Sequence, residues 1–178
     1  TYPGERVQVD VKVVPRKCIA DPEMKLYQYT AIDEYTRIRF LYGYEEQSTY
    51  SSADFVKRLL KWYKRRGITV KCIQTDNGFE FTNRFSPSKR DKKTLFENTL
   101  SQLGIEHKLI RPYTPRHNGK VERSHREDHN KFYSCHRFYS CDDLNVQLAA
   151  RLSRTNNRPM RPLKWFSPIE FLNNSVQY

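Results

Sequence analysis

The 178-residue sequence predicts an α/β protein with a mixed five-stranded sheet flanked by helices. Two patterns support this fold class: β-type runs fill the first quarter of the chain, and later strands alternate with helical segments. The predicted order is β-β-β-α-β-α-β-α-α, which places antiparallel strands first and helix-separated strands after them. A chain of this length is expected to form one core, so we predict a single domain over residues 1–178.

The first three strands are predicted over residues 6–14, 25–32 and 37–44, as an antiparallel meander. In the first strand, valines alternate with polar residues. Successive side chains of a strand point to opposite faces of the sheet. The valines at 7, 9, 11 and 13 therefore share one face, and Gln8, Asp10 and Lys12 share the other.

A helix is predicted over residues 51–66, because apolar residues there recur every three or four positions. Ser51-x-x-Asp54 matches a capping box, and Gly67 stands where a helix would end. The β-branched run 68–73 predicts a central strand. It is followed by Gln74-Thr75-Asp76-Asn77-Gly78, so Asp76 is expected at the carboxyl end of that strand.

The second half predicts a helix over 95–103, a strand over 105–110, and two helices over 119–137 and 142–156. Residues 158–178 contain three prolines and are expected to form an extended C-terminal tail of the domain. Within this tail, Ser167-Pro168-Ile169-Glu170 predicts a last turn or short helix.

Charge is the strongest compositional signal: 32 Lys and Arg against 20 Asp and Glu give a net charge of +12. Such a balance favours an anionic partner, either nucleic acid or an acidic membrane surface. The 12 Tyr and 10 Phe indicate a folded core rather than a basic tail. Without an apolar run of transmembrane length or a signal-like start, we expect a cytoplasmic protein. A chain that begins at Thr1 reads as a fragment of a longer protein.

Three acids hold comparable positions: Asp10 inside the first strand, Asp76 where the fourth strand ends, and Glu122 near the start of a helix. Sites in open α/β sheets gather outside the carboxyl ends of the strands. Two unit charges about 4 Å apart repel by roughly 4 kcal/mol at an effective dielectric of 20, so clustered carboxylates need a cation or protons. Mg²⁺ or Mn²⁺ would suit these oxygens, and two such ions can promote phosphodiester cleavage or joining.

Four segments carry a resemblance to a known family: VQVDVK, IQTDNGFEF, YTPRHNGKVERSHR and TNNRPMRPLKWFSPIEFL. The first three resemble the acidic motifs of the DDE integrase and transposase superfamily. The fourth is similar to the Asn-x-x-Arg-Pro and Thr/Ser-Pro-x-Glu-x-Leu ending of insertion-sequence transposases of the retroviral-integrase type. The resemblance spans essentially the whole chain and implies a ribonuclease-H-like fold.

The resemblance also implies the chemistry. Asp10, Asp76 and Glu122 match the catalytic, metal-binding acids, which would hold two Mg²⁺ or Mn²⁺ ions for 3′-end cleavage and strand transfer. Tyr113, Pro115, Asn118 and Gly119 match the active-site loop. DNA, as element ends and target, is the implied partner, and a homodimer or larger synaptic complex is the implied assembly. Residues of this loop and of the following helix that we expect at the DNA are Arg116, Asn118, Lys120, Arg123, Arg126 and His129.

The sequence departs from the family pattern in two ways. Between Asp76 and Glu122 lie 122 − 76 − 1 = 45 residues, about ten more than the family's usual spacing. We expect the excess in a surface loop over residues 79–93. The amino-terminal DNA-binding domain of the family is absent from this chain, so recognition of element ends is not assigned to it.

Alternative interpretations stay open from the residues alone. A nuclease of the same fold would share the acids, and a non-catalytic DNA-binding module would keep only the basic surface. A zinc site could be formed by His125 and His129 with Cys135 and Cys141. The two tryptophans, at 62 and 165, are expected to pack in the core. Glu80 is a fourth acid close behind Asp76 that could assist the other three, but it is expected to face solvent.

Overall fold

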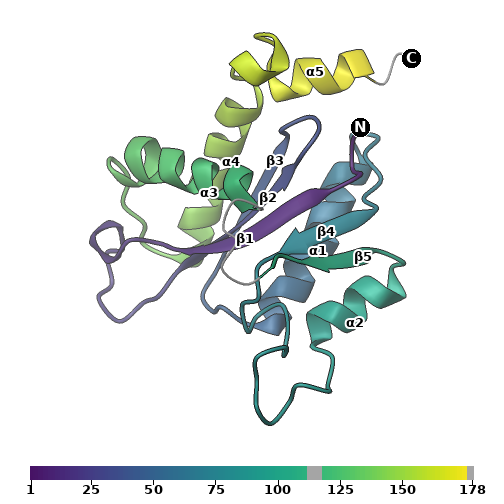
Figure 1. The fold of residues 1–178 in the computed structure, drawn as a ribbon. Helices are drawn as coiled ribbons and strands as arrows, with labels where there is room; N and C mark the ends of the chain where they lie inside the picture. The colour runs from purple at the N-terminus through teal and green to yellow at the C-terminus, as the bar shows by residue number, and fades with distance from the viewer. Residues whose placement is uncertain (112–117, 176–178) are drawn as a thin grey trace.

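A computed structural model describes residues 1–111 and 118–175 of the chain. Its centre is a five-stranded sheet with the order β3-β2-β1-β4-β5 (Figure 1). Strand β1 lies in the middle, antiparallel to β2 and parallel to β4. The predicted mixed five-stranded sheet is therefore confirmed. The strands are β1 (Val7–Val13), β2 (Tyr27–Asp33), β3 (Arg39–Tyr44), β4 (Cys72–Thr75) and β5 (Glu106–Leu109).

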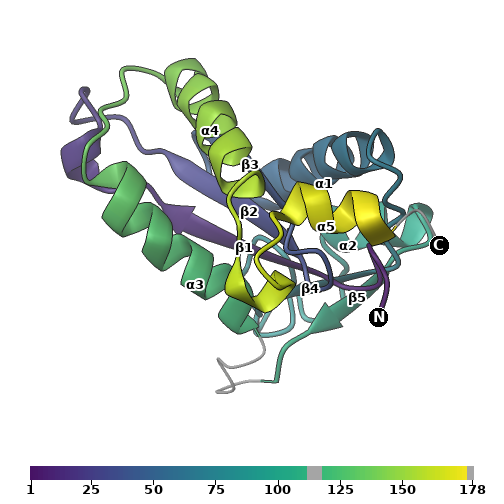
Figure 2. The same ribbon diagram turned by 90° about the horizontal axis from the view of Figure 1, so that it is seen from above.

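Helices cover both faces of this sheet. Figure 2 shows α1 and α3 on opposite sides of the strands. The helices are α1 (Thr49–Lys64), α2 (Leu95–Gln102), α3 (Gly119–Asp128), α4 (Cys141–Asn156) and α5 (Pro168–Ser175). Short helical turns also occur, namely η1 (Arg16–Cys18), η3 (His129–Tyr133) and η4 (Arg161–Leu163).

The face toward α1 is apolar. Phe55 of α1 packs against Tyr29 and Phe40, with ring centroids 5.4 Å apart in both pairs. Phe55 and Tyr29 are fully buried. Burying an aromatic side chain of this size contributes about 1.5–3 kcal/mol. This face therefore supplies most of the core and explains why valines occupy alternate positions of β1.

The face toward α3 and α4 is polar, although it is also covered. Gln8, Gln28 and Thr30 are at most 2% exposed on this side of the sheet. The Nε2 atom of Gln28 donates hydrogen bonds to the Thr30 hydroxyl and, at 3.0 Å, to Asp128 of α3. Buried polar groups are stable only when they are hydrogen-bonded, so this polar face fixes where α3 can sit.

Helix α1 begins differently from the prediction. Its N-cap is Ser48, whose side chain accepts a hydrogen bond from the backbone N–H of Ser51. The expected capping box Ser51-x-x-Asp54 is wrong, because the helix starts earlier and Asp54 instead accepts from the Tyr44 hydroxyl at 2.6 Å. A complete capping box occurs at α2, between Thr94 and Glu97.

Two other boundaries shift. The strand predicted over 68–73 is observed later, as β4 over Cys72–Thr75. The helix predicted over 119–137 ends as an α-helix at Asp128 and continues as the π-helical turn η3. A π turn inserts an extra residue into the helix. Here it accompanies the burial of two consecutive aromatic side chains, Phe132 and Tyr133.

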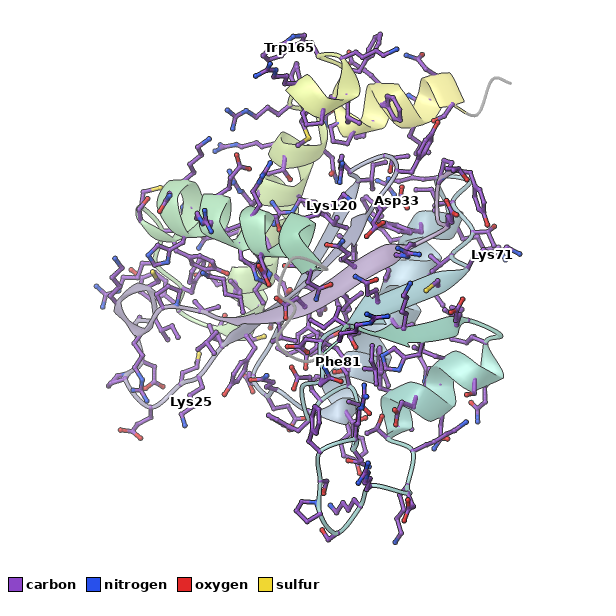
Figure 3. All side chains as sticks on the ribbon, viewed as in Figure 1. Lys25, Asp33, Lys71, Phe81, Lys120 and Trp165 are labelled. Atoms are coloured by element: carbon purple, nitrogen blue, oxygen red, sulfur yellow. The ribbon has the colours of Figure 1, made fainter. Side chains whose placement is uncertain are left out.

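The C-terminal segment is only partly extended, because η4 interrupts it before α5. Helix α5 begins at Pro168, where the sequence predicts a last turn or short helix. Ser167 and Glu170 exchange hydrogen bonds at its start, between backbone N–H groups and side-chain oxygens. Trp165 is 69% exposed and points away from the body of the molecule (Figure 3), so its predicted core position is wrong.

Residues 76–94 form neither strand nor α-helix between β4 and α2. The middle of this segment is exposed, including every basic side chain from Arg84 to Lys93. A hollow of about 350 Å³ lies between this loop and Leu109 of β5. Residues 84–93 thus form an exposed basic loop within the segment 79–93, where the sequence predicts a surface loop. Within the described ranges, the structure has no helix long and apolar enough to cross a membrane.

Candidate active site

Parallel pairing of β1 and β4 relates two of the predicted acids, Asp10 inside β1 and Asp76 directly after β4. Val7 pairs with Ile73 and Gln8 with Gln74, an offset of 73 − 7 = 74 − 8 = 66 residues. The same offset relates Asp10 to Asp76, because 76 − 10 = 66. Asp76 accepts a hydrogen bond from the Gly78 N–H at 2.9 Å, and Asp10 one from the Val11 N–H at 2.9 Å.

Each acid is preceded, two positions earlier, by a glutamine on the same face of the sheet. Gln8 accepts a hydrogen bond from the Val121 N–H in the first turn of α3, at 3.2 Å. Gln74 donates to the side-chain oxygen of Asn118, at 3.4 Å. The two glutamines therefore hold the start of α3 over the strands that carry Asp10 and Asp76. The pattern Gln-x-Asp occurs at both strands, and this repetition is a signal in the sequence that could have identified the two glutamines as site residues.

Glu122 lies in the first turn of α3 and is exposed. The helix that carries it is fixed along its buried side. His125 contacts the Thr30 hydroxyl at 3.0 Å, and Asp128 forms a buried ion pair with Arg39 of β3. Helix α3 cannot rotate about its axis without breaking these polar contacts. The position of Glu122 on the exposed side of α3 is therefore fixed relative to the sheet.

Electrostatics show that the acids lie within range of one another. Burial raises the pKa of Asp10, and the negative charges of Asp76, Glu122 and Glu80 contribute to the same shift, which takes the pKa from 3.8 to about 7. Like charges in a partly desolvated site favour protonation of one member. Asp76 and Glu122 therefore both act on Asp10 by charge, and we call these three residues the acidic cluster.

His125 approaches Asp10 as well, with 3.6 Å between Nδ1 and Oδ2. Burial, together with the charge of Arg39, lowers the pKa of His125 to about 3. The imidazole is therefore neutral at physiological pH and does not form an ion pair with Asp10. His125, three positions after Glu122 on α3, is thus directed toward the sheet by its contacts with Asp10 and Thr30.

The donor set suits a hard divalent cation. Asp10, Asp76 and Glu122 offer carboxylate oxygens, which Mg²⁺ and Mn²⁺ prefer, and their mutual repulsion is the charge that a cation would neutralise. Across residues 1–111 and 118–175, no three Asp, Glu, His or Cys side chains lie close enough together to enclose an ion. Mg²⁺ commonly takes one or two carboxylates and completes its shell with water and phosphate, so an open donor set fits it.

The predicted DNA-contacting residues differ in their surroundings. Arg123, Arg126 and His129 are exposed on α3 and its continuation. Lys120, at the beginning of α3 (Figure 3), lies 3.7 Å from the Glu34 carboxylate. Arg116, like Tyr113 and Pro115 of the predicted loop, is outside the described residues.

Asn118 is a correction to the sequence prediction. Its side chain is 2% exposed and accepts from Gln74, so it packs between helix and sheet instead of facing DNA. The zinc interpretation also finds no support in the described structure. His125 is directed to Thr30 while His129 is exposed, and the Cys141 thiol donates to the Gly43 carbonyl at 3.4 Å.

Glu80 was expected to face solvent, and this expectation is wrong. The residue is 3% exposed and accepts a hydrogen bond from Gln47 at 2.8 Å. Burial and the charge of Asp76 raise its pKa above the usual range. Nothing in the local pattern Asn-Gly-Phe-Glu-Phe distinguishes a buried from an exposed glutamate, so only the folded chain reveals it.

The raised pKa of Asp10 predicts how stability depends on pH. Between pH 3.8 and about 7, the folded protein holds a proton that the unfolded chain has released, so stability falls as pH rises. Asp10→Asn removes this loss. In the metal-free protein with chelator, we expect Asp10→Asn to increase the free energy of unfolding by about 2–4 kcal/mol at pH 7.5 and by about 1 kcal/mol or less at pH 4.5. Urea denaturation at both pH values measures this difference, and an increase independent of pH would contradict it.

Comparison with known proteins assigns the family. The sequence profile of the integrase core domain matches residues 1–115, and a second integrase core domain profile matches residues 103–168. The chain therefore belongs to the integrase core domain family, within the DDE integrase and transposase superfamily.

Two curated relatives cover nearly all of this chain. An integrase named for ORF3 of Spiroplasma virus SpV1-C74 is 33% identical over 173 residues, covering 94% of this chain and 47% of the relative. A transposase named for insertion sequence element IS5376 of Geobacillus stearothermophilus is 28% identical over 170 residues, covering 96% of this chain and 42% of the relative. The chain thus spans about half the length of these relatives.

Solved structures show the same fold. The catalytic core domain of BIV integrase aligns with a TM-score of 0.66 and 20% identity, covering 98% of this chain and 97% of that chain. The simian T-cell lymphotropic virus intasome, solved with PP2A regulatory subunit B56 gamma, aligns with a TM-score of 0.61 and 20% identity. That alignment covers 87% of this chain and 49% of the intasome chain. The predicted ribonuclease-H-like fold is confirmed.

Proposed function

We propose that this chain is the catalytic core of a DNA recombinase that performs 3′-end cleavage and strand transfer during transposition or integration. The observation that carries the proposal is the pairing of β1 with β4, whose register relates Asp10 to Asp76 below the first turn of α3. Family membership supports DNA integration or transposition in general, and the acidic cluster supports the chemistry.

In this proposal, Asp10, Asp76 and Glu122 would hold Mg²⁺ or Mn²⁺, with two ions expected. When bound, such ions supply charge neutralisation at the phosphate and make a hydroxyl a better nucleophile at neutral pH. The protein's own contribution is positional. Gln8, Gln74 and the buried side of α3 hold the three carboxylates in place before DNA arrives, so little reorganisation remains at the moment of reaction.

DNA would approach the exposed side of α3. Arg123 and Arg126 are exposed beside Glu122, and Lys120 lies in the same helix. Basic side chains next to the acids can hold the phosphate backbone, which gives affinity without base specificity. The exposed basic residues of the 84–93 loop extend this positive surface beyond the acids. Self-association into a dimer or synaptic complex belongs to the same proposal.

The test uses the intact protein and a pre-cleaved element-end oligonucleotide with Mn²⁺ and target DNA. We expect joined strands with Mn²⁺ or Mg²⁺ and none with chelator. Products that are cut but never joined would favour a nuclease of the same fold. DNA binding without either product, together with no Mn²⁺ binding in calorimetry, would favour a non-catalytic DNA-binding module.

The basic surface of α3 predicts a salt-dependent affinity. Each phosphate contact that is lost should lower the slope of log affinity against log salt by about one. We expect Arg123→Ala and Arg126→Ala each to weaken binding to unrelated DNA sequences alike and to reduce this slope. Lys61→Ala is the matched control, because Lys61 is exposed on α1 at the opposite face of the sheet. Fluorescence anisotropy at several salt concentrations measures the effect. Equal slopes for Arg126→Ala and wild type would remove Arg126 from the DNA surface.

A further inference from the structure

Glu80 is a buried carboxylate of which only one oxygen has a hydrogen-bond partner in the described structure. Its Oε1 atom accepts the hydrogen bond from Gln47, the residue before the N-cap of α1. Its Oε2 atom is buried without a hydrogen-bond partner in the described structure. An unpartnered buried carboxylate oxygen is costly unless a proton or a cation compensates it. Within residues 1–111 and 118–175, no hydrogen-bond donor meets that atom.

The position of Glu80 is fixed by its surroundings. The next residue, Phe81, is fully buried against Phe96, with ring centroids 5.2 Å apart. Figure 3 shows Phe81 near the carboxyl end of β4. On its other side, the Glu80 carboxylate lies against Gly78. A Cβ atom at Gly78 would come within 2.6 Å of Oε2, so the glycine leaves room for the carboxylate. Glu80 therefore occupies a built position beside the Asp76 turn.

Glu80 also belongs to the acidic cluster by charge. It lies close enough to Asp76 and to Asp10 for their negative charges to influence one another. Its unpartnered oxygen lies against Gly78, whose N–H donates to the Asp76 carboxylate at 2.9 Å, so Glu80 is placed directly behind the turn that carries Asp76. A merely structural glutamate would be expected to pair both oxygens with the protein.

We propose that Glu80 is a buried fourth carboxylate behind the Asp76 turn that strengthens divalent-cation binding by the acidic cluster. This inference rests on the proposed function. Glu80 acts as a positioning residue: its charge strengthens ion binding and orients the Asp76 side of the site. Gly78 and Gln47 serve this role by leaving space for one oxygen and holding the other.

The experiment measures Mn²⁺ binding to the intact protein without DNA, by calorimetry and by the Mn²⁺-induced shift in melting temperature. We expect Glu80→Gln to weaken Mn²⁺ binding by about 10–100-fold, the range found when groups supporting metal ligands are lost. We also expect it to raise the melting temperature of the metal-free protein, because a buried unpaired charge is removed. Glu80→Asp keeps the charge and should bind Mn²⁺ with intermediate affinity. The control is Glu127→Gln, an exposed acid of α3, which should bind Mn²⁺ like wild type.

The outcomes separate this inference from the proposed function. If Glu80→Gln and Glu80→Asp, both folded by circular dichroism, bind Mn²⁺ as wild type does while Asp76→Asn does not, Glu80 is outside the site and the recombinase proposal stands. If wild type binds Mn²⁺ and Glu80→Gln weakens it, but no strands are joined, the inference stands and the recombinase proposal falls. A wild type that binds no Mn²⁺ overturns the inference.

Discussion

Asp10→Asn, Asp76→Asn and Glu122→Gln are each expected to reduce strand joining by at least about 10³-fold. Metal-assisted stabilisation of a phosphoryl transition state is worth several kcal/mol, and each 1.36 kcal/mol corresponds to a tenfold change in rate. The substitutions keep side-chain size but remove the charge that a divalent ion requires. The reaction is followed on labelled element-end oligonucleotides with Mn²⁺.

The matched control in that assay is Glu127→Gln. Glu127 is exposed on the same helix as Glu122 and forms only an exposed pair with Lys131, 3.6 Å away. This variant should join strands at a rate near that of wild type. If all three active-site variants join strands as wild type does, the assignment of the acids is wrong. The three losses should not add in double variants, because the carboxylates act as a unit.

Asp128→Asn is expected to lower the free energy of unfolding by about 3–5 kcal/mol, the cost of removing one partner from a buried ion pair. Asp128 is fully buried. Its oxygens accept from Arg39 of β3, from Gln28 of β2 at 3.0 Å and from Arg151 of α4 at 3.1 Å. Burial alone would raise the pKa of Asp128, but the Arg39 and Arg151 charges hold it below the usual value. The substitution leaves two guanidinium groups without their counter-charge.

Urea denaturation at pH 7 tests this expectation. The neighbouring Glu127→Gln is again the control, since an exposed helical pair contributes only about 0.3–0.5 kcal/mol. Asp128 also ties the end of α3 to the sheet, and α3 carries Glu122. We therefore expect Asp128→Asn to impair strand joining even at temperatures where it remains folded. A loss of stability below about 1 kcal/mol would show that the network is not a main anchor of α3.

The buried ion pair of Asp128 also makes the stability of the folded protein depend on pH in the acidic range. Because the folded-state pKa of Asp128 is depressed, its stabilising contribution is present above the ordinary carboxylate pKa and is lost as pH falls through the folded value. Asp10 acts in the opposite direction. Asp10 and Asp128 thus give the protein opposing responses to acid.

The sequence by itself determined the elements and the order in which they occur. The alternation of valines with polar residues determined which face of β1 is buried, because a one-residue shift in register would expose the valines and bury Gln8, Asp10 and Lys12 on the apolar face. Positive backbone φ angles at Gly67 and Gly104 confirm the predicted ends of the preceding helices. The three acids could be found because Asp10 lies inside a strand, Asp76 follows a strand and Glu122 lies near a helix start, and local pattern indicates all three of these elements.

Only the tertiary structure decided which polar residues are buried. Gln8, Asn118 and Glu80 carry side chains that are usually exposed, and no local period marks them as interior. Gln8 and Asn118 are buried because α3 is laid over the polar face of the sheet, and Glu80 is buried because the loop after β4 packs against α2 and the start of α1. Both packings depend on contacts between residues far apart in sequence. The same long-range packing turned His125 inward and left Trp165 exposed. The three acids and their chemistry could be predicted from the sequence, whereas the buried residues that hold them in place could be identified only from the tertiary structure.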